Sequence, residues 1–492
     1  MAVSEGTPLL HDGTVPPRHH RRVFKIVLGL VLIVGLVLIL LAAALRKLAG
    51  PAVASATTDN GYICGITKNE AGYIKLANKK DDHYFYWFFE SETSPSKDPL
   101  MVWLTGGPGA SSLYALLAEN GPCTVQPDLT TKNNPYAWNN QANVIWLDQP
   151  TDVGFSYGAP EDKDYNGTNV GENLYWFLQG FIDKHPEFDN REFYLFGESY
   201  GGHYVPDGAH YIWEQNKLGD NQPGSKKINL QGIAIGNGWV DPETQYLYAD
   251  AMADNAYNIT FLTDAQIGRM KKDNLVCVEL DLKCRANPLD GTACMDEEEF
   301  SYETHILPFL AAGRNPYDIR EECDTETDPL CDGNDSRLVD FLNSDKARQY
   351  LNVNVGPHKV WKEVNGQVNH DFLASGDNAQ PSQLLVADLL NDGVRVLIYN
   401  GDADLMCNWQ SSDAWTKALE WKGKQGFNSV EERHFFADDV VVLGSPAIDA
   451  GILRSFGNFT FLRVFNAGHM VPKNQPAAAL DMVNKFLCNQ EL

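Results

Sequence analysis

Positive charge is scarce in this sequence of 492 residues. Lysine and arginine together number 39 against 65 aspartates and glutamates, which gives a formal net charge of −26. Such a surface is repelled by a phosphate backbone. Nucleic acid is therefore excluded as a partner.

Motifs for metals and nucleotides are also absent. The nine cysteines include no C-x-x-C pair and no Cys/His pairing at zinc spacing. The sequence has no G-x-G-x-x-G and no G-K-[ST], the patterns of phosphate-binding loops. It shows no internal repeat. We expect no metal and no cofactor.

Apolar side chains are plentiful, at 43% hydrophobic and 11% aromatic residues. A disordered chain lacks this content. The length suffices for two or three average domains, or for one large α/β domain with an insertion.

One apolar run stands near the N-terminus. Residues 26–45 read IVLGLVLIVGLVLILLAAAL without a charge, and twenty helical residues span a bilayer core of about 30 Å. We expect a retained anchor, with a cleaved signal peptide as the alternative. Basic residues are denser before the run than after it, so we expect a type II membrane protein with a cytosolic tail at 1–25.

Two features agree with a lumenal location for the remainder. Five cysteines between Cys277 and Cys331 predict a local disulfide framework. Four sequons predict glycosylation at Asn166, Asn258, Asn334 and Asn458.

The cytosolic tail holds Glu5, Leu9 and Leu10, which resemble an acidic dileucine signal for a sorting adaptor. An accidental leucine pair is the alternative.

The fold class is predicted from short apolar runs. Six short runs rich in aromatic and β-branched residues are predicted to be strands: 84–89, 100–104, 144–147, 193–196, 394–399 and 459–465. Several of them are nearly continuous in apolar residues, as expected for strands covered on both faces, and segments with the apolar spacing of helices lie between them. This order predicts a mostly parallel α/β sheet. Residues 241–375 contain the cysteine cluster, acidic runs and fewer apolar runs of the kind that form strands, and they are interpreted as an inserted cap. The expected division is tail 1–25, membrane helix 26–45, linker 46–60, core 61–240, cap 241–375 and core 376–492.

The run at 193–196 leads directly into Gly197-Glu-Ser-Tyr-Gly201. This matches the G-x-S-x-G elbow, in which a serine sits on a sharp turn between a strand and a helix. Ser199 is therefore the candidate nucleophile. An ionised Glu198 beside it would oppose the developing oxyanion, so this acid needs an explanation.

An acid and a base are expected after later strands, in the order Ser, Asp, His. Asp404 follows the run at 394–399 and His469 follows the run at 459–465. Asp402 is favoured as a turn residue because it comes directly after a glycine. His203 lies in the segment that leads away from Ser199 and is expected to be structural.

The oxyanion needs two backbone N–H donors. The elbow supplies that of Tyr200. The glycine-rich segment 105–109 lets backbone approach a ligand closely, and Gly107 is the expected second donor.

With these residues in place, the sequence resembles the serine carboxypeptidase family from about Gly72 to Leu487. The matching motifs are WLTGGPGASSL (103–113), ENGP (119–122), NNPYAWN (133–139), LDQPTDVGFSY (147–157), FGESYGGHYVP (196–206), IGNGWVDPETQY (235–246), NPYDIREEC (315–323), YNGDADLMCNW (399–409) and FLRVFNAGHMVP (461–472).

The resemblance implies an α/β-hydrolase core with an inserted cap, and release of C-terminal amino acids from peptides and proteins at acidic pH. It implies a Ser199, Asp404, His469 triad with an oxyanion hole at Gly107 and Tyr200. It also implies that Glu119, Glu198 and the residue at position 105 bind the substrate's terminal carboxylate. Two carboxyls in contact cannot both ionise cheaply, so Glu198 would be a neutral donor.

This sequence departs from the family at two positions of the loop before Leu113. Thr105 replaces an asparagine, which places carboxylate binding in question because a hydroxyl offers one donor and an amide two. Ala110 replaces a common cysteine, and residues 361–372, where its partner would lie, have no cysteine either.

The remaining assignments also rest on the resemblance. It implies a Cys323–Cys331 bridge, a free Cys407 near the substrate and Met470 at the pocket for the leaving residue. An inert buried Cys407 is the alternative. If Cys407 is free, the other eight cysteines could form four bridges.

Three hypotheses about function are compatible with the sequence. The leading hypothesis is an acid-active serine carboxypeptidase in the lumen of a lysosome-like, vacuolar or secretory compartment. An acyltransferase or esterase on the same scaffold would pass the acyl group to an alcohol or act on esters. A scaffold or protective homologue would not use the triad.

Overall fold

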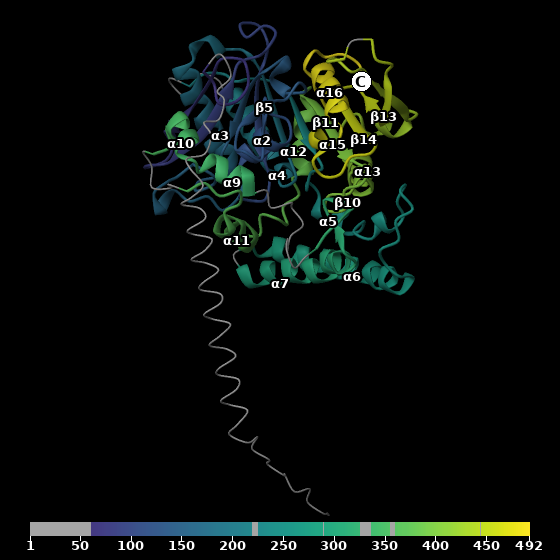
Figure 1. Ribbon diagram of the computed structural model, residues 1–492. Helices are drawn as coiled ribbons and strands as arrows, with labels where there is room; N and C mark the ends of the chain where they lie inside the picture. The colour runs from purple at the N-terminus through teal and green to yellow at the C-terminus, as the bar shows by residue number, and fades with distance from the viewer. Residues whose placement is uncertain (1–60, 219–224, 289, 325–335, 355–359, 443) are drawn as a thin grey trace, which may run out of the picture. The chain divides into compact units, whose positions relative to one another are not determined.

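The computed structural model describes residues 61–218, 225–288, 290–324, 336–354, 360–442 and 444–492 (Figure 1). The predicted tail, membrane helix and linker, with Glu5, Leu9 and Leu10, lie outside these ranges. In the described ranges, none of the helices combines the length and the apolarity that a membrane crossing requires.

A central sheet organises the described residues. Ten of the described strands form it in the order β1-β2-β6-β3-β7-β8-β11-β14-β13-β12. Their bounds are β1 Asn69–Lys75, β2 His83–Phe89, β3 Leu100–Thr105, β6 Asn143–Leu147, β7 Glu192–Glu198, β8 Asn229–Gly236, β11 Arg395–Gly401, β12 Arg433–Ala437, β13 Ile448–Phe456 and β14 Phe459–Val464. A separate pair is formed by β4 (Cys123–Val125) and β5 (Thr131–Asn133).

The six strands from β6 to β14 run parallel to one another. The strands at the two edges, β1 with β2 and β13 with β12, are antiparallel. The parallel centre predicted from sequence is confirmed, and the antiparallel edges make the sheet mixed. Each run predicted as a strand coincides with a strand of this sheet, except that residues 394 and 465 lie just outside β11 and β14.

The apolar strands are buried because helices cover both faces of the sheet. Alternate residues of β2 enter different cores, with Phe85 and Trp87 in one and Tyr84 and Tyr86 in the other. The first core is covered by α2 (Ser112–Ala118) and α16 (Pro476–Leu487), and the second by α3 (Gly167–Lys184), α4 (Gly201–Leu218) and α12 (Gln383–Asn391).

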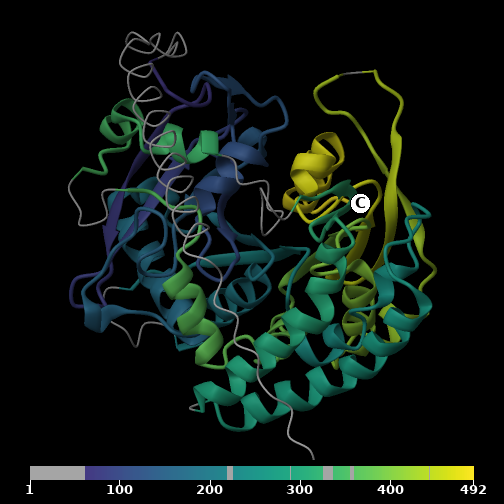
Figure 2. The ribbon, with the colours of Figure 1, turned by 60° about the horizontal axis from the view of Figure 1, so that its bottom comes forward.

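The segment between β8 and β11 is mostly helical. It contains α5 (Pro242–Tyr246), α6 (Asp264–Ala286), α7 (Gly291–Ser301), a π-helical turn (Tyr302–Ile306), α8 (Leu307–Ala311), the pair β9 (Arg314–Asn315) and β10 (Asp318–Glu322), and α11 (Gly366–Ala374). Figures 1 and 2 show α6 and α7 side by side. They lie apart from the central sheet (Figure 1).

Two helices inside the predicted cap range behave differently. The short helices α9 (Ser336–Leu342) and α10 (Asp345–Leu351) place Leu338 and Leu351 in the core that also contains Trp87 of β2. The stretch 336–351 therefore packs with the main domain. The remaining described helices, α13 (Trp409–Ala418), α14 (Lys424–Ser429) and α15 (Val471–Asn474), follow the late strands.

Disulfides stabilise the fold at two described places. Cys64 bonds to Cys123, and Cys284 of α6 bonds to Cys294 of α7. Cys323 is disulfide-bonded, but Cys331 lies outside the described residues, so their pairing stays a prediction.

The possibility of four bridges is wrong. Besides Cys407, both Cys277 and Cys488 are free thiols. The sequence shows that eight cysteines, an even number, remain besides Cys407. It cannot show which of their sulfurs come within bonding distance.

Candidate active site

Ser199 sits on the turn between β7 and α4. Its φ of 62° is left-handed, a conformation that a non-glycine residue adopts only where the surrounding structure enforces it. The backbone enforces it here: Ser199 N–H donates to Gly236 O at 3.1 Å, and Ser199 O accepts from the N–H of Gly202 and Trp239. The strand, elbow and helix thus occur as the motif requires.

Asp404 and His469 meet at the carboxyl ends of β11 and β14. These strands are parallel neighbours, so the loops that follow them leave the sheet at the same edge. Asp404 Oδ2 lies 2.8 Å from Nδ1 of His469. Asp404 also accepts hydrogen bonds from the backbone N–H of Met406 and Cys407.

The other ring nitrogen of His469 remains available. Nε2 is buried and has no hydrogen-bond partner among the described residues. With Nδ1–H donating to Asp404, Nε2 can accept a proton. This is the arrangement that a general base requires.

Asp402 has a different function in the same loop. Its Oδ1 accepts from Asn466 N–H at 2.9 Å, and its Oδ2 accepts from Arg463 at 3.3 Å. Asp402 therefore ties the end of β11 to the segment before His469. Gly401 permits this approach, because a Cβ there would lie 2.0 Å from Gly468 O.

Asn237 was not identified from sequence. Its Nδ2 donates to Asp404 Oδ2 at 2.8 Å, and its Oδ1 accepts from Gly401 N–H at 3.1 Å. Asn237 follows β8, which lies between the nucleophile strand and the acid strand. A strand predicted at 229–236 would have pointed to Asn237 as the residue that follows it. The glycines and polar residues of this segment hide the apolar pattern of a strand.

The expected oxyanion donors lie on adjoining segments. A Cβ on Gly106 would be 2.2 Å from the Tyr200 nitrogen, so the 105–109 loop passes directly beside that backbone N–H. Gly107 has a φ of 110°, which favours glycine. Gly107, Ser199 and Tyr200 all line the same pocket.

The Tyr200 side chain is held from two directions. Its hydroxyl donates to Asp377 Oδ2 at 2.8 Å, and its ring stacks on His203 at 4.6 Å between centroids. His203 is buried, its Nδ1 lies 3.0 Å from Ser382 Oγ, and burial lowers its pKa to about 3. His203 is therefore a neutral packing partner of Tyr200.

Glu119 and Glu198 form a buried pair. Burial raises the pKa of both carboxyls, and the proximity of Glu119 raises that of Glu198 further. If both were ionised, Oε1 and Oε2 of Glu119 and Oε2 of Glu198 would be buried without a donor among the described residues. A shared proton lets the two carboxyls hydrogen-bond to each other, so one of them is neutral at acidic pH.

Thr105 lies beside this pair, since it is opposite Glu198 in the register of β3 and β7. Its hydroxyl oxygen accepts from Trp103 Nε1 at 2.9 Å. That bond fixes the oxygen and leaves the hydroxyl proton able to donate.

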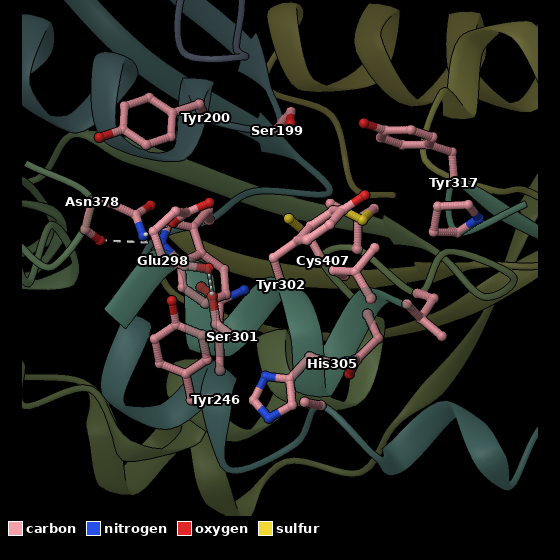
Figure 3. A pocket seen from close by; sticks show the side chains of 18 of the residues that line it. Ser199, Tyr200, Tyr246, Glu298, Ser301, Tyr302, His305, Tyr317, Asn378 and Cys407 are labelled. Carbon is pink, nitrogen blue, oxygen red and sulfur yellow. Dashed lines mark hydrogen bonds between the residues drawn. The ribbon is translucent and has the colours of Figure 1, made fainter. Parts of the chain in front are cut away.

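A pocket of about 220 Å³ opens at Ser199 (Figure 3). Cys407 lines it, and burial raises the thiol pKa well above its usual value, so Cys407 is a neutral wall residue. Met470 packs against the main core, and its sulfur accepts from Tyr114 Oη at 3.3 Å. The segment between β8 and β11 contributes further lining residues that were not identified from sequence: Tyr246, Glu298, Ser301, Tyr302 and His305.

The predicted glycosylation sites differ in exposure. Asn258 is exposed, whereas the Asn166 side chain caps α3 and accepts from Asn169 N–H. Asn458 Nδ2 donates to the carbonyls of Leu390 and Val394. Asn334 lies outside the described residues.

Comparison with known proteins identifies the family of this chain. The family model described as serine carboxypeptidase matches residues 65–489. The chain belongs to the serine carboxypeptidase family.

Individual serine carboxypeptidases are similar over most of the chain. Carboxypeptidase Y homolog A of Arthroderma otae is 38% identical over 421 residues, covering 85% of this chain and 74% of the relative. Carboxypeptidase Y of Saccharomyces cerevisiae is 37% identical over 433 residues, covering 86% and 77%.

A solved structure of a carboxypeptidase is also similar to this chain. The crystal structure of Kex1(delta)p, a prohormone-processing carboxypeptidase from Saccharomyces cerevisiae, has a TM-score of 0.73 and 25% identity, and the match covers 86% of this chain and 92% of that one. The mixed sheet with its helices is thus that of the serine carboxypeptidases, and this protein is a hydrolase of that class.

Proposed function

We propose that this serine carboxypeptidase cleaves the last peptide bond of its substrates with Ser199, His469 and Asp404. Ser199 Oγ attacks the carbonyl carbon while His469 Nε2 takes the hydroxyl proton. His469 then gives that proton to the leaving amine, and water releases the acyl group in the second half of the reaction. Asp404 orients the imidazole and stabilises its cation. The N–H groups of Gly107 and Tyr200 stabilise the oxyanion.

The terminal carboxylate of the substrate is bound by Glu119, Glu198 and Thr105. A neutral Glu198 donates a hydrogen bond to it, and an ionised Glu198 repels it. Because burial and Glu119 both raise the pKa of Glu198, binding is strongest at acidic pH. This accounts for the acid beside the nucleophile.

The observation that supports this proposal most is the 2.8 Å contact between Asp404 and His469, at the sheet edge where the Ser199 elbow ends β7. The test is mass spectrometry of a peptide with a free C-terminus, incubated with the protein at pH 5. Stepwise loss of single C-terminal residues is expected, together with fluorophosphonate labelling. Ser199→Ala should abolish both. Labelling without release of any residue would contradict the proposal.

We also propose that the catalytic domain lies in an oxidising lumen behind an N-terminal type II anchor at 26–45, with Glu5, Leu9 and Leu10 read by a sorting adaptor. The disulfides Cys64–Cys123 and Cys284–Cys294 support an oxidising compartment. Among the described sequons, Asn258 is the one best placed for a glycan because it is exposed. A glycosidase-sensitive mass shift that Asn258→Gln removes would support this placement. A protein made in its native host without any glycan would contradict it.

A further inference from the structure

Glu298 places a carboxyl on the wall of the Ser199 pocket, and no basic side chain among the described lining residues pairs with it. It is the only carboxyl among the described residues that line this pocket, and no lysine or arginine lines it. Besides tyrosines and the neutral Cys407 thiol, the imidazole of His305 is the other ionisable group in the described lining. Burial lowers its pKa to about 4, so it is neutral above that pH. A carboxyl facing an otherwise uncharged pocket favours a cationic ligand group.

The neighbouring Glu297 does not share this position. Glu297 is buried and accepts a hydrogen bond from Tyr246 Oη, whereas Glu298 is half-buried at the pocket wall. Oε2 of Glu298 receives one long hydrogen bond, 3.4 Å from Asn378 Nδ2. Glu298 thus retains capacity to bind a substrate group.

Two aromatic rings line the same pocket as this carboxyl. Tyr246 and Trp239 both line the pocket and pack edge to face, 4.9 Å between centroids. Such rings accommodate the aliphatic stem of a lysine or arginine, and their faces attract its cation.

The position of His469 decides which part of the substrate meets Glu298. The ring of Tyr317 lies 5.2 Å from that of His469. Because His469 protonates the leaving amine, the departing C-terminal residue lies on the Tyr317 side of Ser199. Figure 3 shows Tyr200, Asn378 and Glu298 on the other side of Ser199. The residue that forms the acyl-enzyme, which is the penultimate residue of the peptide, therefore points its side chain toward Glu298.

We infer that Glu298 makes this enzyme prefer peptides with lysine or arginine at the penultimate position. The inference rests on the proposed function, since it assigns the acyl side of the same reaction. Glu298 determines specificity and takes no part in bond cleavage. Hydrolysis of peptides with an uncharged penultimate residue therefore does not depend on its charge.

The preference depends on the ionisation of Glu298. Burial raises its pKa to about 7. The surrounding groups include two more acids whose pKa is raised, Glu297 to about 8 and Asp281 of α6 to about 7, and Arg285, which pairs with Asp281 at 2.8 Å. Burial raises the pKa of Tyr246 of α5 well above its usual value, so its hydroxyl stays neutral, and His305 and Asn378 carry no charge at the pH values concerned. As pH rises through 7, Glu298 ionises, so the preference for a cationic side chain should grow.

The experiment compares N-blocked Lys-Leu with N-blocked norleucine-Leu, which has a similar stem without the charge. In the wild type we expect kcat/KM at pH 7 to favour Lys-Leu by about tenfold, as for one hydrogen bond to a charged group. Glu298→Gln should remove that preference, so that kcat/KM for Lys-Leu falls about tenfold relative to kcat/KM for norleucine-Leu. Glu299→Gln is the matched control, because Glu299 is the next acid on α7 and is exposed; it should leave the preference intact.

The outcomes separate the inferred preference for a cationic penultimate residue from the proposed carboxypeptidase function. An equal Lys-to-norleucine ratio in the wild type and Glu298→Gln overturns the inference and leaves the carboxypeptidase function standing. N-blocked Leu-Lys is measured alongside, and a change in Glu298→Gln that is seen only with this substrate overturns the assignment to the acyl side. If the wild type hydrolyses neither peptide, the proposed function fails and the inference with it. Should Glu298→Gln not fold, a wild-type ratio that does not rise between pH 5 and pH 8 overturns the inference by itself.

Discussion

Nδ2 of Asn237 donates a 2.8 Å hydrogen bond to Oδ2 of Asp404. The same carboxylate oxygen faces Nδ1 of His469. Asn237 therefore fixes the acid that in turn fixes the base, through a buried bond to a charged group. Such bonds are worth about 1.5–3 kcal/mol.

We expect Asn237→Ala to lower kcat by about 10- to 100-fold with little change in KM, because the bond orients the acid and touches no substrate. Steady-state kinetics on one peptide gives both values. Asn143→Ala is the matched control, since Asn143 is a buried asparagine that bonds to the 95–99 loop away from Ser199. An equal loss of kcat in both variants would show a general effect on folding instead.

The Tyr200 hydroxyl gives a second prediction. Removing its bond to Asp377 in Tyr200→Phe should lower the free energy of unfolding by about 1 kcal/mol. It should also lower kcat, because the same residue supplies an oxyanion donor from its backbone. Tyr194→Phe removes a hydroxyl that donates to Leu487 O at 3.0 Å and accepts from Arg395, and it should lower only stability. Identical kcat values for Tyr200→Phe and the wild type would contradict a positioning role for this side chain.

Thr105→Val tests the departure from the family asparagine. Valine keeps the shape and removes the hydroxyl beside Glu198, so we expect KM for free-acid peptides to rise by about tenfold, the loss of one hydrogen bond to a carboxylate. The corresponding peptide amides, which lack that carboxylate, should show no rise. A rise of the same size for both substrates would mean that Thr105 shapes the loop without binding the carboxylate.

Stability should fall as pH rises. Burial raises the pKa of three carboxyls away from the catalytic residues, Asp82 to about 8, Asp148 to about 7 and Glu297 to about 8. The same groups titrate near 4 in the unfolded chain. Their native protonation contributes stability that is fully present below about pH 4 and is lost as pH rises through 7 to 8.

Thermal unfolding at pH 5 and pH 8 measures this effect, and we expect the higher Tm at pH 5. Asp82→Asn, which cannot ionise, should reduce the difference. A Tm that is equal or higher at pH 8 would contradict the account of these buried acids.

Much of the site could be predicted because it depends on chain adjacency. The apolar run 193–196 joins Ser199 to a buried strand. The runs before Asp404 and His469 become parallel neighbours, β11 and β14. When strands are parallel, residues just beyond their carboxyl ends meet at one edge. Local sequence was therefore sufficient to predict the strand that each of these three residues follows.

The rest depends on tertiary contacts that no local pattern shows. Asn237 contacts Asp404 across 167 positions of sequence, and β8 before it, NLQGIAIG, mixes glycine and polar residues. Glu298 looks like any acid in the run Asp296–Glu299 until α7 packs against the 376–378 segment. Whether Cys277 and Cys488 are free thiols likewise depends on the distances between sulfurs, which the number of cysteines does not show.

The central claim is that a neutral Glu198, paired with Glu119, binds the terminal carboxylate of the substrate. The most direct test is kcat/KM from pH 4 to pH 8 for one peptide as free acid and as amide, in the wild type and in Glu198→Gln. We predict that the wild type prefers the free acid at pH 5 and loses this preference as pH rises, and that Glu198→Gln, which stays a neutral donor, keeps it to higher pH. Equal turnover of acid and amide at pH 5, or the same pH profile in both proteins, would contradict the account.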